Sequence, residues 1–254
     1  CGALGDIYFI ANQRGETRTF TASMRINRKP ECWNPVTGEM NAHPAYQIKD
    51  SRTEVTLTLA SNESVFIVYP ITENNEGKAP LQRVQKSKDK PTEKSKNIAI
   101  EPEKYTVTFV ADNQTVARRE LFDWSKEEDK QIRYYSGTAI YKTTFSWKNK
   151  QQKGQEVYLH LGTVYNLATV YVNGIDCGTV WTAPYRANIT AALKKGTNEL
   201  EIEVTNTWAN ALKGADEGKA PFEGIWTNAK YRKQEDTLLP AGLLGPLWLE
   251  QNNK

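Results

Sequence analysis

Hydrophobic and polar residues alternate with a period of two along much of this chain. The segment NELEIEV at 198–204 places leucine, isoleucine and valine on one face and three glutamates on the other. TEVTLTL at 53–59 has the same period, which predicts a strand with one buried and one wet face. VFIVY at 65–69 is an unbroken apolar run, and its β-branched and aromatic content predicts a strand buried on both faces.

Other segments extend this pattern and separate the strands by turns. Asn173-Gly174 predicts a two-residue hairpin, because both central positions of such a turn need positive φ. ECWNPVTGEM at 31–40 predicts a turn or tight hairpin. Ser125 and Glu128 stand at capping-box spacing and predict a short helix after Trp124. Further strands are expected at 6–12, 17–26, 45–48, 64–69 and 105–109. The pattern predicts an all-β protein built from sandwiches.

A charged segment divides the chain. Between 73 and 103 the sequence is rich in Lys, Glu, Asp, Asn, Pro and Ser, as in QKSKDKPTEKSKN, and cannot bury enough apolar surface to fold alone. It is expected to be a linker or a long exposed hairpin. We therefore predict a small β-sandwich at 1–100 and a second sandwich at 101–254, which suits a length of 254 residues.

Charge and cysteine content exclude several classes of protein. The net charge is only +3, with Lys and Arg interleaved with acids, so nucleic-acid binding is not expected. No apolar run reaches the ~18 residues of a membrane span. The three cysteines, Cys1, Cys32 and Cys177, form neither a disulfide framework nor a C-x-x-C zinc motif. Cys1 is the residue type at which a mature bacterial lipoprotein carries its lipid, and the alternative is a truncation boundary.

Several short motifs in the second half specify turns and strand ends. They are SGTA at 136–139 with Tyr141 and Phe145, VYVNG at 170–174, PY at 184–185 before NIT at 188–190, and GTNEL at 196–200. Together they resemble the sugar-binding β-sandwich of glycoside hydrolase family 2. The resemblance implies that the second domain is a galactose-binding-like jelly roll.

Longer segments show a second likeness along nearly the whole chain. In order they are DIYFIANQ at 6–13, RKPECWNPVTGEM at 28–40, SNESVFIVY at 61–69, YYSGTAIYKTTF at 134–145 and EVTNTWANAL at 203–212. They resemble the carboxy-terminal β-domains of α-L-rhamnosidases of glycoside hydrolase family 106. Those enzymes carry their catalytic carboxylates on a preceding (β/α) barrel, which these 254 residues lack. The resemblance implies an accessory fragment or a stand-alone descendant.

Catalytic motifs are absent from the sequence. There is no G-x-S-x-G elbow and no phosphate-binding glycine loop, and the two histidines, His43 and His160, are assigned to different domains. His160 is expected to be a structural strand residue. Glycoside hydrolysis needs a pair of carboxyl groups ~5 to 10 Å apart. Glu223 is the best candidate, because Phe222 and Trp226 could desolvate it and raise its pKa, and Asp176 is weaker. The alternative for Glu223 is an exposed loop carboxylate.

Three predicted loops combine aromatic rings with hydrogen-bonding groups, which is the combination that sugars require. The loops are VWTAPYR at 180–186, NTWAN at 206–210 and FEGIWTN at 222–228. Loops collect at the ends of a sandwich, where ligand sites form. We predict a carbohydrate site from Trp181, Tyr185, Arg186, Trp208, Asn210, Glu223 and Trp226. The alternative for the aromatic rings is core or rim packing, which is the role assigned to Trp33, Trp124, Trp147 and Trp248.

The sequence thus favours a non-catalytic carbohydrate-binding or accessory module of glycan degradation, located outside the cytoplasm. One alternative is a glycoside hydrolase, either this chain or a longer parent, and another is a purely structural domain pair. The expected partners are an oligo- or polysaccharide and a catalytic domain. No cofactor is expected, with a structural calcium ion as an alternative, although no Asp-rich loop specifies a site for it.

Overall fold

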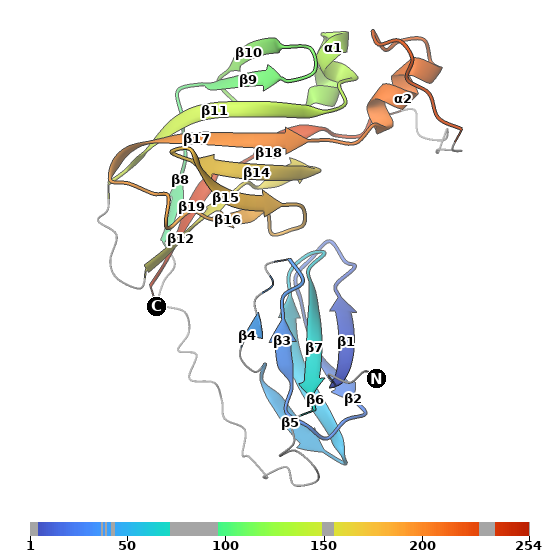
Figure 1. Cartoon of the computed structure of the whole chain (residues 1–254), viewed down its shortest axis with the longest axis vertical. Helices are drawn as coiled ribbons and strands as arrows, with labels where there is room; N and C mark the ends of the chain where they lie inside the picture. The colour runs from blue at the N-terminus through green and yellow to red at the C-terminus, as the bar shows by residue number, and fades with distance from the viewer. Residues whose placement is uncertain are drawn as a thin grey trace. The chain divides into compact units, whose positions relative to one another are not determined.

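A computed structural model describes residues 5–36, 38, 40–41, 44–71, 96–148, 155–228 and 237–253. The protein is all-β, as predicted, with antiparallel strand pairing throughout its named sheets (Figure 1). It divides into two compact units: residues 1–92 with 182–184, and residues 93–181 with 185–254. Most of the charged segment expected at 73–103, as well as Cys1 and His43, lies outside the described residues.

The first unit contains two sheets that face one another across a core. One has the order β1 (Gly5–Ala11), β7 (Ser64–Pro70), β3 (Glu31–Trp33), β4 (Met40–Asn41). The other has the order β2 (Arg18–Met24), β6 (Arg52–Leu59), β5 (Tyr46–Lys49). Val55, Leu57 and Leu59 are buried and the threonines between them are exposed, which confirms the alternation predicted for β6.

Strand β7 is central in its sheet and buried on both faces, as its apolar run predicts. Ile67 and Tyr69 belong to the core and are fully buried. Val68 lies on the opposite face and is only 2% exposed. The hairpin predicted at 31–40 is also confirmed, because β3 pairs with β4 through Trp33 and Met40.

The second unit contains a larger core between two main sheets. The six-stranded sheet has the order β10 (Gln114–Arg118), β9 (Tyr105–Phe109), β11 (Thr138–Trp147), β17 (Gly196–Thr205), β14 (Leu167–Val172), β15 (Ile175–Val180). The four-stranded sheet has the order β16 (Arg186–Asn188), β12 (Gln155–His160), β19 (Trp248–Asn253), β8 (Lys96–Ala99). A small pair joins β13 (Thr163–Tyr165) to β18 (Gly242–Gly245). Because β8 pairs with β19, residues 96–99 belong to this unit.

The predicted Asn-Gly hairpin is present between β14 and β15. Val172 pairs with Ile175, and Asn173 and Gly174 both have positive φ, 53° and 78°. The Asn173 side chain donates a hydrogen bond of 2.8 Å to Oδ1 of Asn198, which is fully buried. The two turns at this end of the six-stranded sheet therefore support each other.

The capping box predicted after Trp124 is wrong. A 3₁₀ turn, η1 (Trp124–Lys126), is capped by Asp123, whose carboxylate accepts a hydrogen bond of 3.0 Å from the Ser125 amide. The short helix α1 (Lys130–Arg133) is capped in the same way by Asp129. Aspartate carboxylates thus satisfy the free amides of both starts, and the Ser125 backbone lies inside the first turn.

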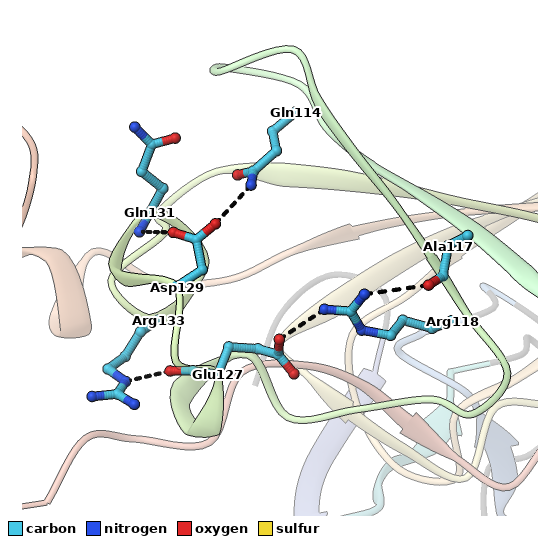
Figure 2. Close-up of polar contacts among 7 residues, drawn as sticks. All are labelled: Gln114, Ala117, Arg118, Glu127, Asp129, Gln131 and Arg133. Atoms are coloured by element: carbon cyan, nitrogen blue, oxygen red, sulfur yellow. Dashed lines mark hydrogen bonds and ion pairs between the residues drawn. The ribbon is translucent and has the colours of Figure 1, made fainter.

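Polar contacts tie α1 to the edge of the six-stranded sheet (Figure 2). The Gln114 side chain donates a hydrogen bond of 2.8 Å to Asp129, and Arg118 makes an ion pair of 2.8 Å with Glu127. Both donors lie on strand β10. Because both acceptors lie just before the start of α1, the contacts hold residues 127–129 against β10.

Trp124 is the centre of an aromatic cluster in the second core. Its ring is fully buried and makes edge-to-face contacts with Phe109 and Tyr135. Its indole Nε1 donates a hydrogen bond of 2.7 Å to the Tyr141 hydroxyl. Burial raises the pKa of Tyr141, so the phenol stays protonated at neutral pH. The packing role predicted for Trp124 and for the buried Trp147 is confirmed.

Gly242 is required by this aromatic cluster. An added Cβ would lie 2.7 Å from Cε2 of Trp124, whereas at Gly196, which has nearly the same φ (97° against 100°), it would meet nothing within 4 Å. We expect Gly196→Ala to cost about 1 kcal/mol through its positive φ. Gly242→Ala should cost about 1–3 kcal/mol more, because the buried indole must move. Urea unfolding of the two variants measures the difference, and equal losses would contradict it.

Candidate functional site

Strand register brings two predicted ligand loops to the same end of the six-stranded sheet. Near this end, one row of paired residues crosses the sheet: Phe109, Ala139, Val204, Ala168 and Val180. Trp181 follows Val180 directly, and Trp208 follows the end of β17 at the start of α2 (Ala209–Asp216). Figure 1 shows α2 at this end of the sheet. Because β14 alone separates β15 from β17, the two strand ends are about 10 Å apart.

The indole rings of these loops are exposed. Trp181 is 58% exposed and Trp208 is 66% exposed, and Trp226, in the loop after α2, is 76% exposed. The alternative that these rings are buried in packing is therefore wrong. Their accessible area leaves these rings free to contact a ligand or a partner.

Asn210 and Asn206 hold the loops in place through paired side-chain hydrogen bonds. The Asn210 side chain is buried, accepts a hydrogen bond of 2.8 Å from the Leu239 amide and donates one of 2.7 Å to the Leu239 carbonyl. Asn206 makes an equivalent pair of bonds to Gly137 and Tyr135. Asn210 was predicted as a ligand contact, but the structure places its amide between α2 and the segment before β18.

Glu223 lies at the surface of the loop that follows α2. Its side chain is exposed, and Trp226, which was expected to shield it, is exposed as well. The predicted desolvation of Glu223 is therefore wrong. Asp176 is also exposed and accepts a hydrogen bond of 2.7 Å from the Gly178 amide in its own hairpin. Neither carboxylate has the environment of a general acid.

Tyr185 and Arg186, the last predicted residues, lie at the start of β16. Tyr185 is half-buried and packs against the core of the second unit, and this burial raises its pKa. Arg186 is exposed on the outward face of the four-stranded sheet, where its guanidinium lies 4.7 Å from the ring centre of Tyr158. Arg186 therefore lies on the four-stranded sheet, whereas Trp181 and Trp208 follow strands of the six-stranded sheet.

Arg186 belongs to a polar and aromatic cluster that the sequence reasoning missed. Arg186, His160 and Trp248 are register partners on adjacent strands, and the His160 and Trp248 rings stack with centres 3.6 Å apart. Glu250 lies 2.7 Å from His160 Nε2 and 3.5 Å from Arg186. The available signal was the alternation in EVYLH and WLE, which places these side chains on one face.

The electrostatics of His160 depend on burial more than on its acidic neighbour. Desolvation lowers its pKa from the ordinary value, and the hydrogen bond and charge of Glu250 only partly offset this effect. Arg186 adds a smaller lowering. The ring is therefore neutral at pH 7, and its Nε2–H donates the hydrogen bond to the Glu250 carboxylate.

A groove of about 890 Å³ lies on the outward face of the six-stranded sheet. One row across it contains Thr106, Lys142, Glu201 and Tyr171 on neighbouring strands. Lys142 makes an ion pair of 2.9 Å with Glu201. The pKa of Tyr171 is raised, chiefly by the Glu203 carboxylate. The groove therefore offers hydroxyl, carboxylate and ammonium groups beside the Tyr171 ring.

The described part of the chain contains neither a metal-binding cluster nor a membrane-spanning helix. Within it, no group of three or more His, Cys, Asp or Glu side chains is arranged to hold a metal ion. The helices of the same described ranges include none long and apolar enough to cross a membrane.

The sequence of the second unit matches a known family. Residues 93–237 match the model for the glycosyl hydrolase 2 galactose-binding domain-like family, and the chain belongs to this family. The galactose-binding-like assignment of the second domain is thereby confirmed.

Two relatives extend the comparison beyond this domain. A Formosa agariphila protein that carries the name of a beta-glucuronidase is 35% identical over an alignment of 170 positions, and the match covers 56% of this chain and 15% of that protein. A rhamnosidase structure from Novosphingobium sp. PP1Y covers 99% of this chain with 33% identity and a TM-score of 0.76. This chain corresponds to 23% of that rhamnosidase. The chain thus consists of β-domains related to accessory domains of glycoside hydrolases, and it spans less than a quarter of either relative.

We expect His160 to titrate below pH 6.5, because burial outweighs the nearby carboxylate. The unfolded chain then takes up this proton before the native chain does, so the contribution of His160 to stability falls as pH drops through about 6.5. NMR titration of a His43→Gln variant isolates the ring, since the chain has two histidines. Glu250→Gln should lower the pKa further. A pKa at or above 6.5 would contradict this.

Proposed function

We propose that this chain is a non-catalytic carbohydrate-binding module of glycan degradation, related to the carboxy-terminal β-domains of family 106 α-L-rhamnosidases. The observation that carries the proposal is the exposure of Trp181 and Trp208 at one end of the six-stranded sheet of the galactose-binding-like domain. The two loops leave this end about 10 Å apart, as judged from strand spacing. One oligosaccharide is long enough to contact both.

A site that stacks on sugar rings needs indole rings that are exposed before the ligand binds. Covering roughly 120 Å² of each ring would contribute about 3 kcal/mol at ~25 cal/mol per Å². Trp208 lies at the start of α2, whose position is secured by the buried Asn210 amide. The ring is therefore presented on an ordered element, which reduces the entropy lost on binding.

Catalysis is assigned by this proposal to a longer protein and not to these residues. Glu223 is exposed, and a glycosidase needs a second carboxyl group held at a defined distance from the first. Both relatives with at least 30% identity are several times longer than the part they share with this chain. We infer that this chain belongs to a longer protein, and that the longer protein contains a catalytic domain of the rhamnosidase type, beside which this module acts.

We expect Trp208→Ala and Trp181→Ala each to weaken glycan binding about 10- to 100-fold, because a large aromatic contact is lost. A glycan array on the purified chain identifies the ligand, and titration calorimetry with that ligand measures the dissociation constants. Ile175→Ala is the matched control, since Ile175 is 49% exposed at the opposite end of the same sheet.

The result also separates the rival functions. Release of sugar by the wild-type chain, abolished in Glu223→Gln, would establish the enzyme alternative in place of binding. Unchanged affinity in both tryptophan variants would move the site elsewhere, with the groove beside Tyr171 as the next surface to test. No binding to any glycan would leave the structural role.

A further inference from the structure

The two sheets of the first unit present very different outward faces. The outward face of the β2, β6 and β5 sheet is polar, with Thr19 bonded to Thr58 at 2.9 Å and Thr21 bonded to Thr56 at 3.1 Å. The outward face of the β1, β7, β3 and β4 sheet is apolar. A sandwich needs only its inner faces to be apolar, so this second apolar face requires a separate reason.

Strand register aligns the apolar side chains in a continuous row. Phe9 pairs with Phe66, Phe66 with Trp33, and Trp33 with Met40, so the row crosses all four strands. We call these four residues the apolar stripe. The Phe9 and Phe66 rings are in contact, with centres 5.1 Å apart. Ile7, two residues along β1, extends the same face, whereas its strand partner Val68 is only 2% exposed.

Part of the stripe and the residue beside it are exposed. Phe9 is 60% exposed and Met40 is 70% exposed, and Ile7 beside them is 54% exposed. A large apolar side chain offers roughly 200 Å² when fully accessible, so these three residues present about 350 Å². That area is within the range of the largest apolar patch on a typical monomer, which is often functional.

Charge is nearly absent from this face. Among the described residues of the stripe and of the row beside it, Glu31 is the sole charged side chain, and its carboxylate accepts a hydrogen bond of 2.9 Å from the Trp33 indole. A second copy of the same face would therefore meet it without like-charge repulsion. Self-complementarity of this kind is the requirement for a two-fold symmetric interface.

We propose that the apolar stripe is the contact surface of a homodimer, in which two copies pack this sheet face to face. Sheet-on-sheet packing is already what this sheet does on its inner side, through Ile67 and Tyr69. Two copies would bury about 700 Å² from the three exposed residues, and the half-buried Phe66 and Trp33 would bring the total to about 1,000 Å². An interface of this size belongs to the weak, transient class.

The test is sedimentation equilibrium of the full chain over a concentration series. Phe9→Asp should weaken dimerisation at least tenfold, because it places a charge on the exposed β1 end of the stripe. Phe9 is outside the core, so the variant should keep the fold, and circular dichroism checks this. Thr21→Asp is the matched control, being the same kind of change at an exposed strand position on the polar face of the same unit.

A second measurement locates the contact. Hydrogen exchange at high and low concentration should show added protection in 5–11 and 64–70 but not in 18–24. A dimer that Phe9→Asp removes and Thr21→Asp retains supports the proposal. A monomer at every concentration, a dimer unaffected by Phe9→Asp, or assemblies larger than two copies would overturn it. These readouts use no glycan, so the carbohydrate proposal stands or fails separately.

Discussion

The antiparallel pairing of β11 with β17 is the constraint on which the second unit depends. Ten consecutive residue pairs join Thr138–Trp147 to Gly196–Thr205. This register directs Tyr141 and Ile202 into the core and Lys142 and Glu201 to the outward face. A slip of one residue would exchange the two faces, so burial of the apolar set holds the register. Both the groove and the placement of the two loops at one end of the sheet follow from this single alignment.

Aromatic residues in this protein have two different tasks, and burial separates them. Trp124 and Trp147 are sealed in the second core, where an indole contributes apolar area and its N–H needs a partner. For Trp124 that partner is the Tyr141 hydroxyl. Trp181 and Trp208 are left in water at a strand end, where their area stays available for a contact outside the fold. A loop position allows this, because it does not need to fill a core.

The two units also differ in what they offer to a partner. The second unit presents loop aromatics and a polar groove, which suit a hydroxylated ligand that requires both stacking and directional hydrogen bonds. The first unit presents the apolar stripe, whose aromatic and Met members suit an apolar protein surface. A module that belongs beside a catalytic domain and also pairs with itself would use separate faces for these contacts.

The sequence by itself indicated the fold class, the hairpins and several of the strands, whereas the strand at 96–99 fell in the segment expected to be a linker or hairpin. Alternation in 53–59 and 198–204 and the Asn-Gly turn at 173–174 are local patterns, because a residue two positions away shares the same face of a strand. The motif order also indicated the family of the second domain. The helix caps after Trp124 were missed, because nearby aspartates compete with the Ser125 and Glu128 spacing.

Only the tertiary structure decided which side chains meet and which face water. Spacing in the sequence could not tell that Asn210 is buried against Leu239 while Trp208, two residues earlier, is exposed. It could not bring His160 to Trp248 and Glu250, or Phe9 to Trp33 and Met40, because these residues are neighbours only through strand pairing. Strand order and register are set by the burial of whole faces at once. For that reason the composition of each surface depends on the complete fold.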